Sequence, residues 1–254
     1  MTERFSVYHV PNPTAKLYGI GSAILGRCVY TGNTLAPPWP KYFSPSVPPH
    51  PARASVYGFH ATLVAPFRTL VPVQTLAETL ENLCQTIDSF EVGPLELSLL
   101  EPGFPALIPK EAPPALSALE ERLVKTFAAY ALPIEPEDLA RREPLTARQR
   151  ALAKKWGYPY VLDQFRYHLT LGDPLNETAD DLSRDKLNYL DLLHSLLSDE
   201  IVASHHLDSL CLCRQASKGG PFKVITVSNF RTDPTRSEPT GADPTGSDLM
   251  CPDP

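Results

Sequence analysis

The pattern of apolar and polar positions predicts strands that alternate with amphipathic helices. Apolar residues recur at three- and four-residue steps over Pro72–Asp88 and again over 115–130, which is typical of one helix face. Thr146 is a good N-cap for a further helix over 146–156. Other helices are expected over Thr14–Val29 and 178–198. Strands are expected at Arg4–Val10, at Tyr57–Ala65 (ended by Pro66), and at Phe90–Leu100, Ala106–Pro109, Phe165–Leu171, Leu207–Arg214 and Phe222–Phe230.

The order of these elements contains a repeat. A strand, a helix and two further strands follow one another from Tyr57 to Pro109, and the same order returns from Phe165 to Phe230. Two such units predict an α+β fold in which two antiparallel sheets face each other and the helices lie outside. The proline-rich stretch over 31–55 is expected to be a loop.

The last residues form a different kind of segment. A five-residue repeat begins at Asp233, Glu238 and Asp243 and contains no large apolar side chain. Such a segment buries too little surface to offset the entropy of ordering. We therefore expect a two-lobed domain over residues 1–230 and a disordered, acidic, Pro/Thr-rich tail over 231–254.

Charge and cysteine content restrict the classes of partner. Half of the formal net charge of −6 lies in residues 231–254, which hold five acids against two arginines. The body is therefore weakly acidic and has no general attraction to nucleic acid or to an anionic membrane. No signal-like or membrane-spanning apolar stretch is present in the sequence. The five cysteines are dispersed apart from Cys211 and Cys213, which favours reduced, buried thiols and a cytoplasmic location.

The first strand of each unit carries the same short motif. Phe59-His-Ala-Thr-Leu63 matches Tyr167-His-Leu-Thr-Leu171, with an aromatic residue before each histidine. About one His-x-Ser/Thr triplet is expected by chance in a chain of this composition, but roughly 0.01 copies with these flanks are expected. The paired motif is therefore a specific signal, whereas the other five histidines lack this context and favour structural or surface roles.

The spacing of the motif indicates its chemistry. Residues two apart on a strand share a face, so His60 with Thr62 and His168 with Thr170 are expected to meet at a cleft. One imidazole can accept a proton from the attacking group while the other protonates the leaving oxygen, as in-line displacement at phosphorus requires. The threonine hydroxyls can donate to non-bridging phosphate oxygens.

Three further residues are weaker candidates for substrate binding. Arg166 has the same alternation as His168, so its guanidinium is able to hold phosphate, although a salt bridge at the rim explains it equally well. Tyr160 offers a stacking surface for a base or sugar, or it packs in the fold. Tyr57 lies an odd number of residues from His60 and reaches the site only if Gly58 interrupts the strand. No metal-ligand set is evident, so neither a metal nor another cofactor is expected.

These motifs and their surroundings resemble the 2H phosphoesterase superfamily, and within it the bacterial subfamily that is associated with phosphonate metabolism. The resemblance covers residues 4–230. It is carried by Tyr57-Gly-Phe-His-Ala-Thr-Leu-Val-Ala-Pro-Phe-Arg68, Leu139-Ala-Arg-Arg142, Leu145-Thr-Ala-Arg-Gln-Arg-Ala-Leu152, Trp156-Gly-Tyr-Pro-Tyr-Val161 and Phe165-Arg-Tyr-His-Leu-Thr-Leu171. Val64 stands where relatives often carry Lys, and the turn at Glu101 is more acidic, so both departures leave the substrate open.

The resemblance implies a two-lobed fold with one His-x-Thr strand per lobe and a metal-independent cyclic phosphodiesterase. Its substrate is expected to be a nucleoside 2′,3′-cyclic phosphate or a ribose cyclic phosphate. The protein is expected to be a monomer and to have no membrane partner. RNA end processing by the same histidines is an alternative that the acidic charge disfavours. A non-catalytic nucleotide-binding module is the other alternative, but binding alone does not require two titratable groups.

Overall fold

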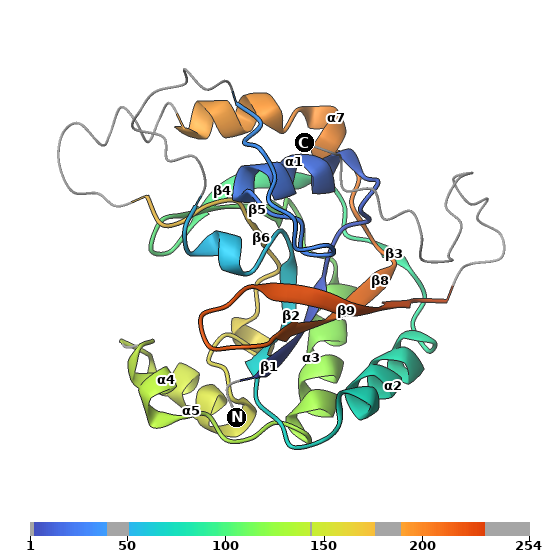
Figure 1. The fold of residues 1–254 in the computed structure, drawn as a ribbon, viewed down its shortest axis with the longest axis vertical. Helices are drawn as coiled ribbons and strands as arrows, with labels where there is room; N and C mark the ends of the chain where they lie inside the picture. Colours follow the sequence, from blue (N-terminus) through green and yellow to red (C-terminus); the bar gives the residue numbers. More distant parts are fainter. Residues whose placement is uncertain (1–2, 40–50, 143, 176–188, 232–254) are drawn as a thin grey trace.

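The computed structural model describes residues 3–39, 51–142, 144–175 and 189–231. Its larger sheet has four antiparallel strands in the order β2-β1-β8-β9 (Figure 1). These are β1 (Arg4–His9), β2 (Ala61–Phe67), β8 (Ser209–Gln215) and β9 (Phe222–Asn229). The register of β2 on β1 is shifted by a bulge: Val7 lies opposite Val64, but the next residue, Tyr8, lies opposite Thr62.

The second sheet has three antiparallel strands in the order β4-β5-β6, and a short ladder joins β3 to β7. These strands are β3 (Phe90–Glu91), β4 (Leu95–Leu100), β5 (Phe104–Pro109), β6 (Leu169–Thr170) and β7 (His206–Leu207). One His-x-Thr motif therefore belongs to the edge strand of each sheet, β2 and β6. The predicted α+β fold with two antiparallel sheets is confirmed.

The two sequence units cross over when they form the sheets. The hairpin β4–β5 follows β2 along the chain but pairs with β6. The hairpin β8–β9 follows β6 but pairs through β8 with β1, next to β2. Each lobe therefore combines the motif strand of one unit with the hairpin of the other.

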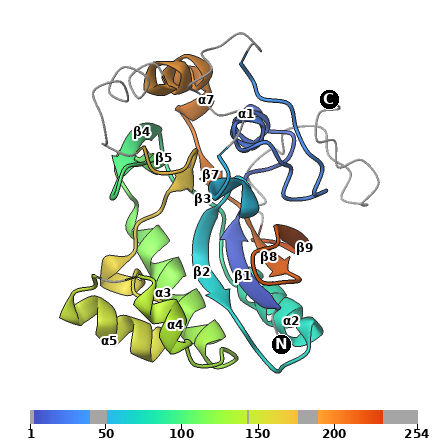
Figure 2. The ribbon, with the colours of Figure 1, turned by 60° about the vertical axis from the view of Figure 1, so that its left-hand side comes forward.

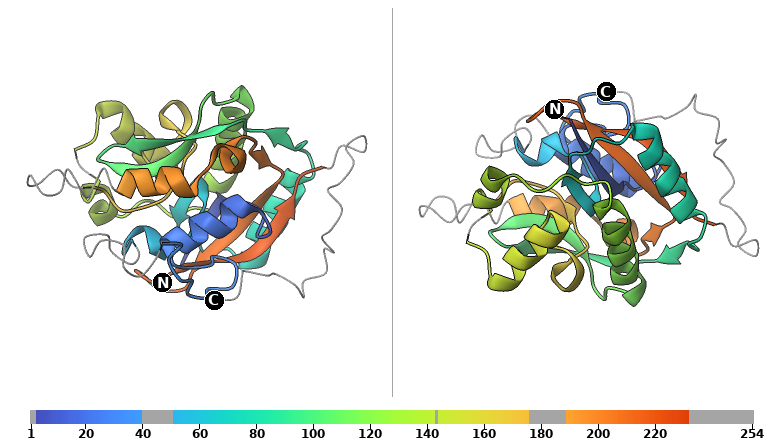
Figure 3. Two further views of the ribbon diagram at one scale, coloured as in Figure 1. Left: turned by 90° about the horizontal axis from the view of Figure 1, so that it is seen from above. Right: turned by 90° about the horizontal axis from the view of Figure 1, so that it is seen from below.

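The helices cover both ends of the molecule, and the strands lie between them (Figures 1 and 2). α1 lies near the viewer from above, and α2 to α5 lie near the viewer from below (Figure 3). α3 packs against β2, and α2 packs against β8 and β9. The bounds are α1 (Lys16–Leu25), α2 (Val73–Cys84), α3 (Pro114–Ala128), α4 (Pro136–Ala140), α5 (Ala147–Trp156) and α7 (Asp199–Val202), with 3₁₀ turns η1 (Ala54–Val56) and η2 (Leu162–Gln164).

The first motif strand is shorter at its start and longer at its end than predicted. Tyr57 lies in the turn after η1, and β2 begins only at Ala61 because Gly58 has a positive φ of 74° that breaks the extended backbone. Pro66 does not end the strand, because β2 lies at the sheet edge and the missing N–H costs no ladder bond there.

The second motif strand is reduced to two residues. In the register that pairs Leu107 with Leu169, Tyr167 would lie opposite Pro109. Proline has no N–H to donate, so the ladder ends before Tyr167. Burial still alternates from Tyr167 to Leu171, with His168 and Thr170 partly exposed and the residues between them buried. The predicted alternation of faces is therefore retained without a regular strand.

Other predicted elements hold with changed bounds. Thr146 caps α5 in a capping box with Gln149, as predicted. The predicted strand over Phe90–Leu100 is split at Gly93 (φ 90°) into β3 and β4, and that over Leu207–Arg214 is split into β7 and β8. The short helix α4 was not predicted. Of the expected helix over 178–198, residues 189–196 are helical and 176–188 lie outside the described residues.

The end of the described chain belongs to the folded body. Arg231, the first residue of the predicted tail, pairs with Asp88 at 2.8 Å and its backbone N–H donates to the carbonyl oxygen of Ile87. Residues 232–254 lie outside the described part, so the tail stays a prediction. Cys84, Cys211 and Cys213 carry free, buried thiols as predicted, but Cys28 is disulfide-bonded, and for that residue the prediction is wrong.

One continuous core joins the two sheets. It includes Val7, Leu63 and Leu212 of the larger sheet together with Leu95 and Leu107 of the smaller one. In the part of the chain that the structure describes, no helix has both the length and the apolarity that a membrane span requires.

Candidate active site

His60 is held from behind by the turn that precedes β2. Its Nδ1 lies 2.8 Å from the carbonyl oxygen of Gly58, and its Nε2 lies 3.1 Å from the hydroxyl of Thr62. The ring stacks on Tyr8 with centroids 3.7 Å apart, and only 9% of the residue is exposed. In the neutral ring, the Nδ1–H donates to Gly58 and Nε2 carries the lone pair toward Thr62.

His168 repeats this arrangement in the other lobe. Its Nδ1 lies 2.8 Å from the carbonyl oxygen of Arg166, again two residues before the histidine. Nδ1 donation to this carbonyl leaves Nε2 as the free ring nitrogen. Both motifs therefore fix the same tautomer by the same local contact.

Burial keeps both imidazoles neutral. Loss of water on burial, opposed in part by the hydrogen bond to Gly58 and assisted by the proximity of His168, lowers the pKa of His60 to about 4. Burial also lowers the pKa of His168, which is the more exposed of the two. A mechanism with one acid and one base needs one protonated imidazole, and neither pKa provides it in the free protein near neutral pH. A bound anion is needed to protonate one of them.

A buried arginine supports the turn beneath His60. The Nε of Arg27 donates to the carbonyl oxygen of Ser55 at 3.1 Å, and its Nη2 donates to that of Val56 at 3.1 Å. Arg27 is 9% exposed, and no acid forms an ion pair with it among the described residues. It follows α1 in a region with no motif, so sequence reasoning had no signal for it.

Asp173 connects the two motif segments from the other side. Its carboxylate accepts hydrogen bonds from the backbone N–H groups of Arg53, at 3.0 and 3.1 Å, and of Ala54, at 2.8 Å. These groups begin η1, the turn that leads into Gly58 and His60. Asp173 stands two residues after the second motif, and that position was its only sequence signal.

The predicted substrate-binding residues lie at different distances from this centre. Thr62 and Thr170 are half-buried on the motif strands. Tyr57 stacks on Phe222 with centroids 5.4 Å apart and lies 6.3 Å from the His60 ring, with 37% of the residue exposed. Arg166 is exposed and has no side-chain partner among the described residues.

Tyr160 has no direct contact with either histidine. It is 41% exposed and meets Tyr158 edge to face at 5.5 Å. Tyr158 lies under the guanidinium of Arg142, 4.7 Å from the ring centroid, and near enough to Tyr57 to interact with it electrostatically. The structure therefore joins Tyr160 to the site only through Tyr158 and Tyr57.

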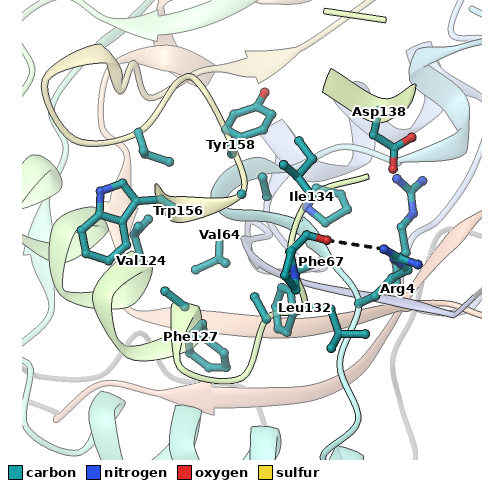
Figure 4. Close-up of a pocket in the computed structure, with 18 of the residues that line it drawn as sticks. Arg4, Val64, Phe67, Val124, Phe127, Leu132, Ile134, Asp138, Trp156 and Tyr158 are labelled. Atoms are coloured by element: carbon teal, nitrogen blue, oxygen red, sulfur yellow. Dashed lines mark hydrogen bonds between the residues drawn. The ribbon is translucent and has the colours of Figure 1, made fainter. Parts of the chain in front are cut away.

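Val64, which departs from the resembled family, lines a pocket that has both apolar and charged residues in its wall. Figure 4 shows Val64 among Val124, Phe127, Trp156 and Tyr158, between the end of β2 and helix α3. Neither motif histidine lines this pocket. Within the described ranges, no group of three or more His, Cys, Asp or Glu residues is placed to hold a metal ion.

Comparison with known proteins shows the family of the chain. The model of the family described as "Protein of unknown function (DUF1045)" matches residues 62–223, and the chain belongs to this family. The match includes Thr62 and the whole second motif.

Two curated relatives share this stretch within longer proteins. The chain is 33% identical over 178 residues to the ribose 1,5-bisphosphate phosphokinase PhnN of Laribacter hongkongensis and 32% identical over 185 residues to that of Janthinobacterium sp.. Each alignment covers 68% of this chain but only 41% and 39% of the relatives. The chain therefore spans about two fifths of the length of these relatives.

The similar solved structures have low sequence identity to this chain. A structure titled as a phosphoesterase matches with a TM-score of 0.43 and 11% identity, over 91% of this chain and 99% of that one. E. coli LigT in its apo form matches with a TM-score of 0.41 and 12% identity, over 91% and 98%. Likeness at this level assigns no activity.

Proposed function

We propose that this protein is a 2H-type phosphoesterase that hydrolyses a small cyclic phosphodiester without a metal ion. The observation that carries the proposal is the matched pair of histidines. Each donates from Nδ1 to the carbonyl oxygen two residues earlier, and each precedes a threonine by two residues. A structural histidine in one motif would not require an equivalent partner in a second sheet.

The two histidines differ enough in burial to suggest their roles. His60 has a pKa of about 4 and stays neutral, so its Nε2 is suited to accept the proton of the attacking water. His168 is more exposed, and a bound phosphate anion raises the pKa of a histidine beside it. We therefore assign His168 as the acid that protonates the leaving oxygen when the phosphorus–oxygen ester bond breaks.

Two hydroxyl groups and one guanidinium are the phosphate-binding donors in this proposal. The hydroxyl of Thr62, which bonds His60 in the free protein, can turn to a non-bridging oxygen when substrate binds. In this proposal Thr170, on β6, does the same. Arg166 supplies an exposed guanidinium next to His168.

The substrate class is inferred from the relatives. Their name refers to ribose 1,5-bisphosphate, and the shared stretch is only part of those proteins. A ribose cyclic phosphate or a nucleoside 2′,3′-cyclic phosphate combines a ribose with the bond that two histidines can cleave. A role in phosphonate metabolism, a cytoplasmic location and a monomeric state belong to the same proposal.

Alanine substitution of each histidine tests the roles. We expect His60→Ala and His168→Ala each to lower kcat by about 10²–10⁴-fold on the cyclic phosphate that the wild type cleaves, because each removes one proton transfer. His194→Ala is the matched control. His194 is exposed on a helix outside both motifs, so this variant should keep full activity. A loss of only a few-fold in either motif variant would refute the mechanism.

Chelation tests the absence of a metal. Turnover should be unchanged after dialysis against EDTA, because the two imidazoles supply both proton transfers. Activity that disappears with EDTA and returns with a divalent ion would contradict the proposal.

A further inference from the structure

A second set of titratable side chains lies buried beside the motif histidines. The hydroxyl of Tyr167 lies 2.6 Å from Nδ1 of His9 and 2.7 Å from Nε2 of His205. All three residues are at most 5% exposed. Tyr167 directly precedes His168 and is buried where His168 is partly exposed, so the two side chains take opposite sides of the backbone.

This chain of hydrogen bonds joins the backbones that carry the two motif histidines. His9 ends β1 and lies opposite Ala61 in the β1–β2 register, and Ala61 directly follows His60. Tyr167 directly precedes His168. A path of two covalent neighbours, one strand pair and one hydrogen bond therefore runs from His60 to His168.

No strand pairing connects the two motifs. β2 belongs to the four-stranded sheet and β6 to the three-stranded sheet. β6 is only two residues long, so its ladder with β5 holds the segment before it weakly. Tyr167 lies in that unpaired segment. Its hydrogen bond to His9 of β1 therefore restrains the position of the neighbouring His168 where the strand ladder does not.

His205 holds the hydroxyl of Tyr167 from the chain next to the β3–β7 ladder. The carbonyl oxygen of His205 accepts from the N–H of Val92 at 2.7 Å, next to the β3–β7 ladder. Burial lowers the pKa of His9 well below its usual value and lowers that of His205 to about 4, so both rings are neutral. The tyrosine donates its single proton to one ring and accepts from the other, which satisfies both bonds.

We propose that Tyr167, held between His9 and His205, is a positioning residue that sets the separation of His60 and His168. The proposal rests on the proposed function, because it gives the two histidines a joint task. In-line displacement requires a base and an acid on opposite sides of phosphorus at a fixed distance. A phenylalanine at position 167 would pack in the same space but would have no hydroxyl to hold the segment at a fixed distance from His9 and His205.

The test compares Tyr167 with Tyr189, a second tyrosine whose hydroxyl holds the segment around the second motif. Tyr167→Phe removes the link between the sheets and keeps the ring. Tyr189→Phe is the matched control, because Tyr189 is 8% exposed and its hydroxyl donates to the carbonyl oxygen of Leu171 at 3.2 Å without reaching β1. We expect Tyr167→Phe to lower kcat by about 10- to 100-fold with KM changed less than about twofold, and Tyr189→Phe to keep kcat within about twofold.

Substitution of the partner supplies a rescue. His9→Asn keeps a polar group near the position of Nδ1, whereas His9→Leu removes it. We expect the asparagine variant to retain more kcat than the leucine variant in the Tyr167 background, and the two to be equal when Tyr167 is phenylalanine. Equal losses in both backgrounds would show that His9 acts only through packing.

A structural readout separates this proposal from the proposed function. Crystal structures of the wild type and of Tyr167→Phe should show a change in the distance between the two Nε2 atoms on the order of 0.5 Å, whatever reaction the site performs. An unchanged distance, or a kcat loss equal to that of Tyr189→Phe, overturns the positioning role. Full activity of His60→Ala overturns the proposed function, and the distance measurement still tests the link.

Discussion

At the scale of single residues, the position of His60 depends on the backbone of Gly58. Its φ of 74° turns the carbonyl oxygen toward the His60 ring, and a Cβ on Gly58 would lie 2.8 Å from the Cβ of Val29. Few side chains tolerate this conformation, and none has room beside Val29. One glycine thus connects the packing of the loop after α1 with the tautomer of a motif histidine.

Alanine at this position should therefore lower activity and stability together. We expect Gly58→Ala to lose at least about 10-fold in kcat and more than the roughly 1–2 kcal/mol of unfolding free energy that a left-handed backbone alone costs. Gly157→Ala is the control, since Gly157 has φ 78° but nothing within 4 Å of its added Cβ. It should lose stability by the backbone cost only and keep kcat; equal behaviour of the two variants would contradict the role of Gly58.

Residue-scale chemistry was predictable where it was repeated in the sequence. His60, Thr62, His168 and Thr170 were found because the same triplet with the same flanks occurs twice. Tyr8 and Arg27 were not found. Tyr8 stacks on His60 because β1 pairs with β2, and Arg27 donates to the turn before His60 from a loop; neither contact produces a pattern in the sequence. The pKa of His60 was also out of reach, because it depends on burial by the whole fold.

At the scale of elements, the 3₁₀ turn η1 carries the backbone into the site. Asp173 accepts from its first N–H groups, and Arg27 donates to its carbonyl oxygens, so opposite charges hold the two ends of the turn. The turn therefore depends on Asp173, which follows the second motif, and on Arg27, which follows α1.

Removal of the carboxylate should loosen this turn. We expect Asp173→Ala to cost on the order of 1 kcal/mol of unfolding free energy, as loss of a cap does, and to lower kcat several-fold because the turn positions Gly58. Thr146→Ala removes a cap of the same kind from α5, away from the site, and should cost similar stability with no change in kcat. If both variants keep wild-type kcat, η1 does not position His60.

Element boundaries followed from sequence only in part. Helix α5 began where its N-cap predicted, because capping is a local property. The motif strands did not, since Gly58 delays β2 and the prolines of β5 limit β6. These limits depend on the partner strand, and a single-strand pattern contains no information about its partner.

At the scale of the whole molecule, buried neutral histidines make stability depend on pH. Burial lowers the pKa of His60 and of His205 to about 4, whereas an unfolded histidine titrates near 6.5. Between these values the unfolded chain binds more protons, so the unfolding free energy falls as pH falls. Each histidine contributes at most on the order of 3 kcal/mol to this loss.

Urea unfolding between pH 7 and pH 4.5 measures this effect. The unfolding free energy should decrease steadily over that range, and His205→Asn should make the decrease shallower. His194→Asn changes an exposed histidine and should leave the pH dependence as in the wild type. The same decrease in His205→Asn as in the wild type would show that other groups cause it.

The crossed pairing of the hairpins also determines when the molecule can fold during synthesis. β1, at Arg4–His9, pairs with β8, at Ser209–Gln215, so more than 190 residues must leave the ribosome before the larger sheet can close. Such high contact order slows folding and leaves strand edges open to other chains meanwhile. One edge of β1 in the nascent N-terminal half therefore stays unpaired until β8 emerges.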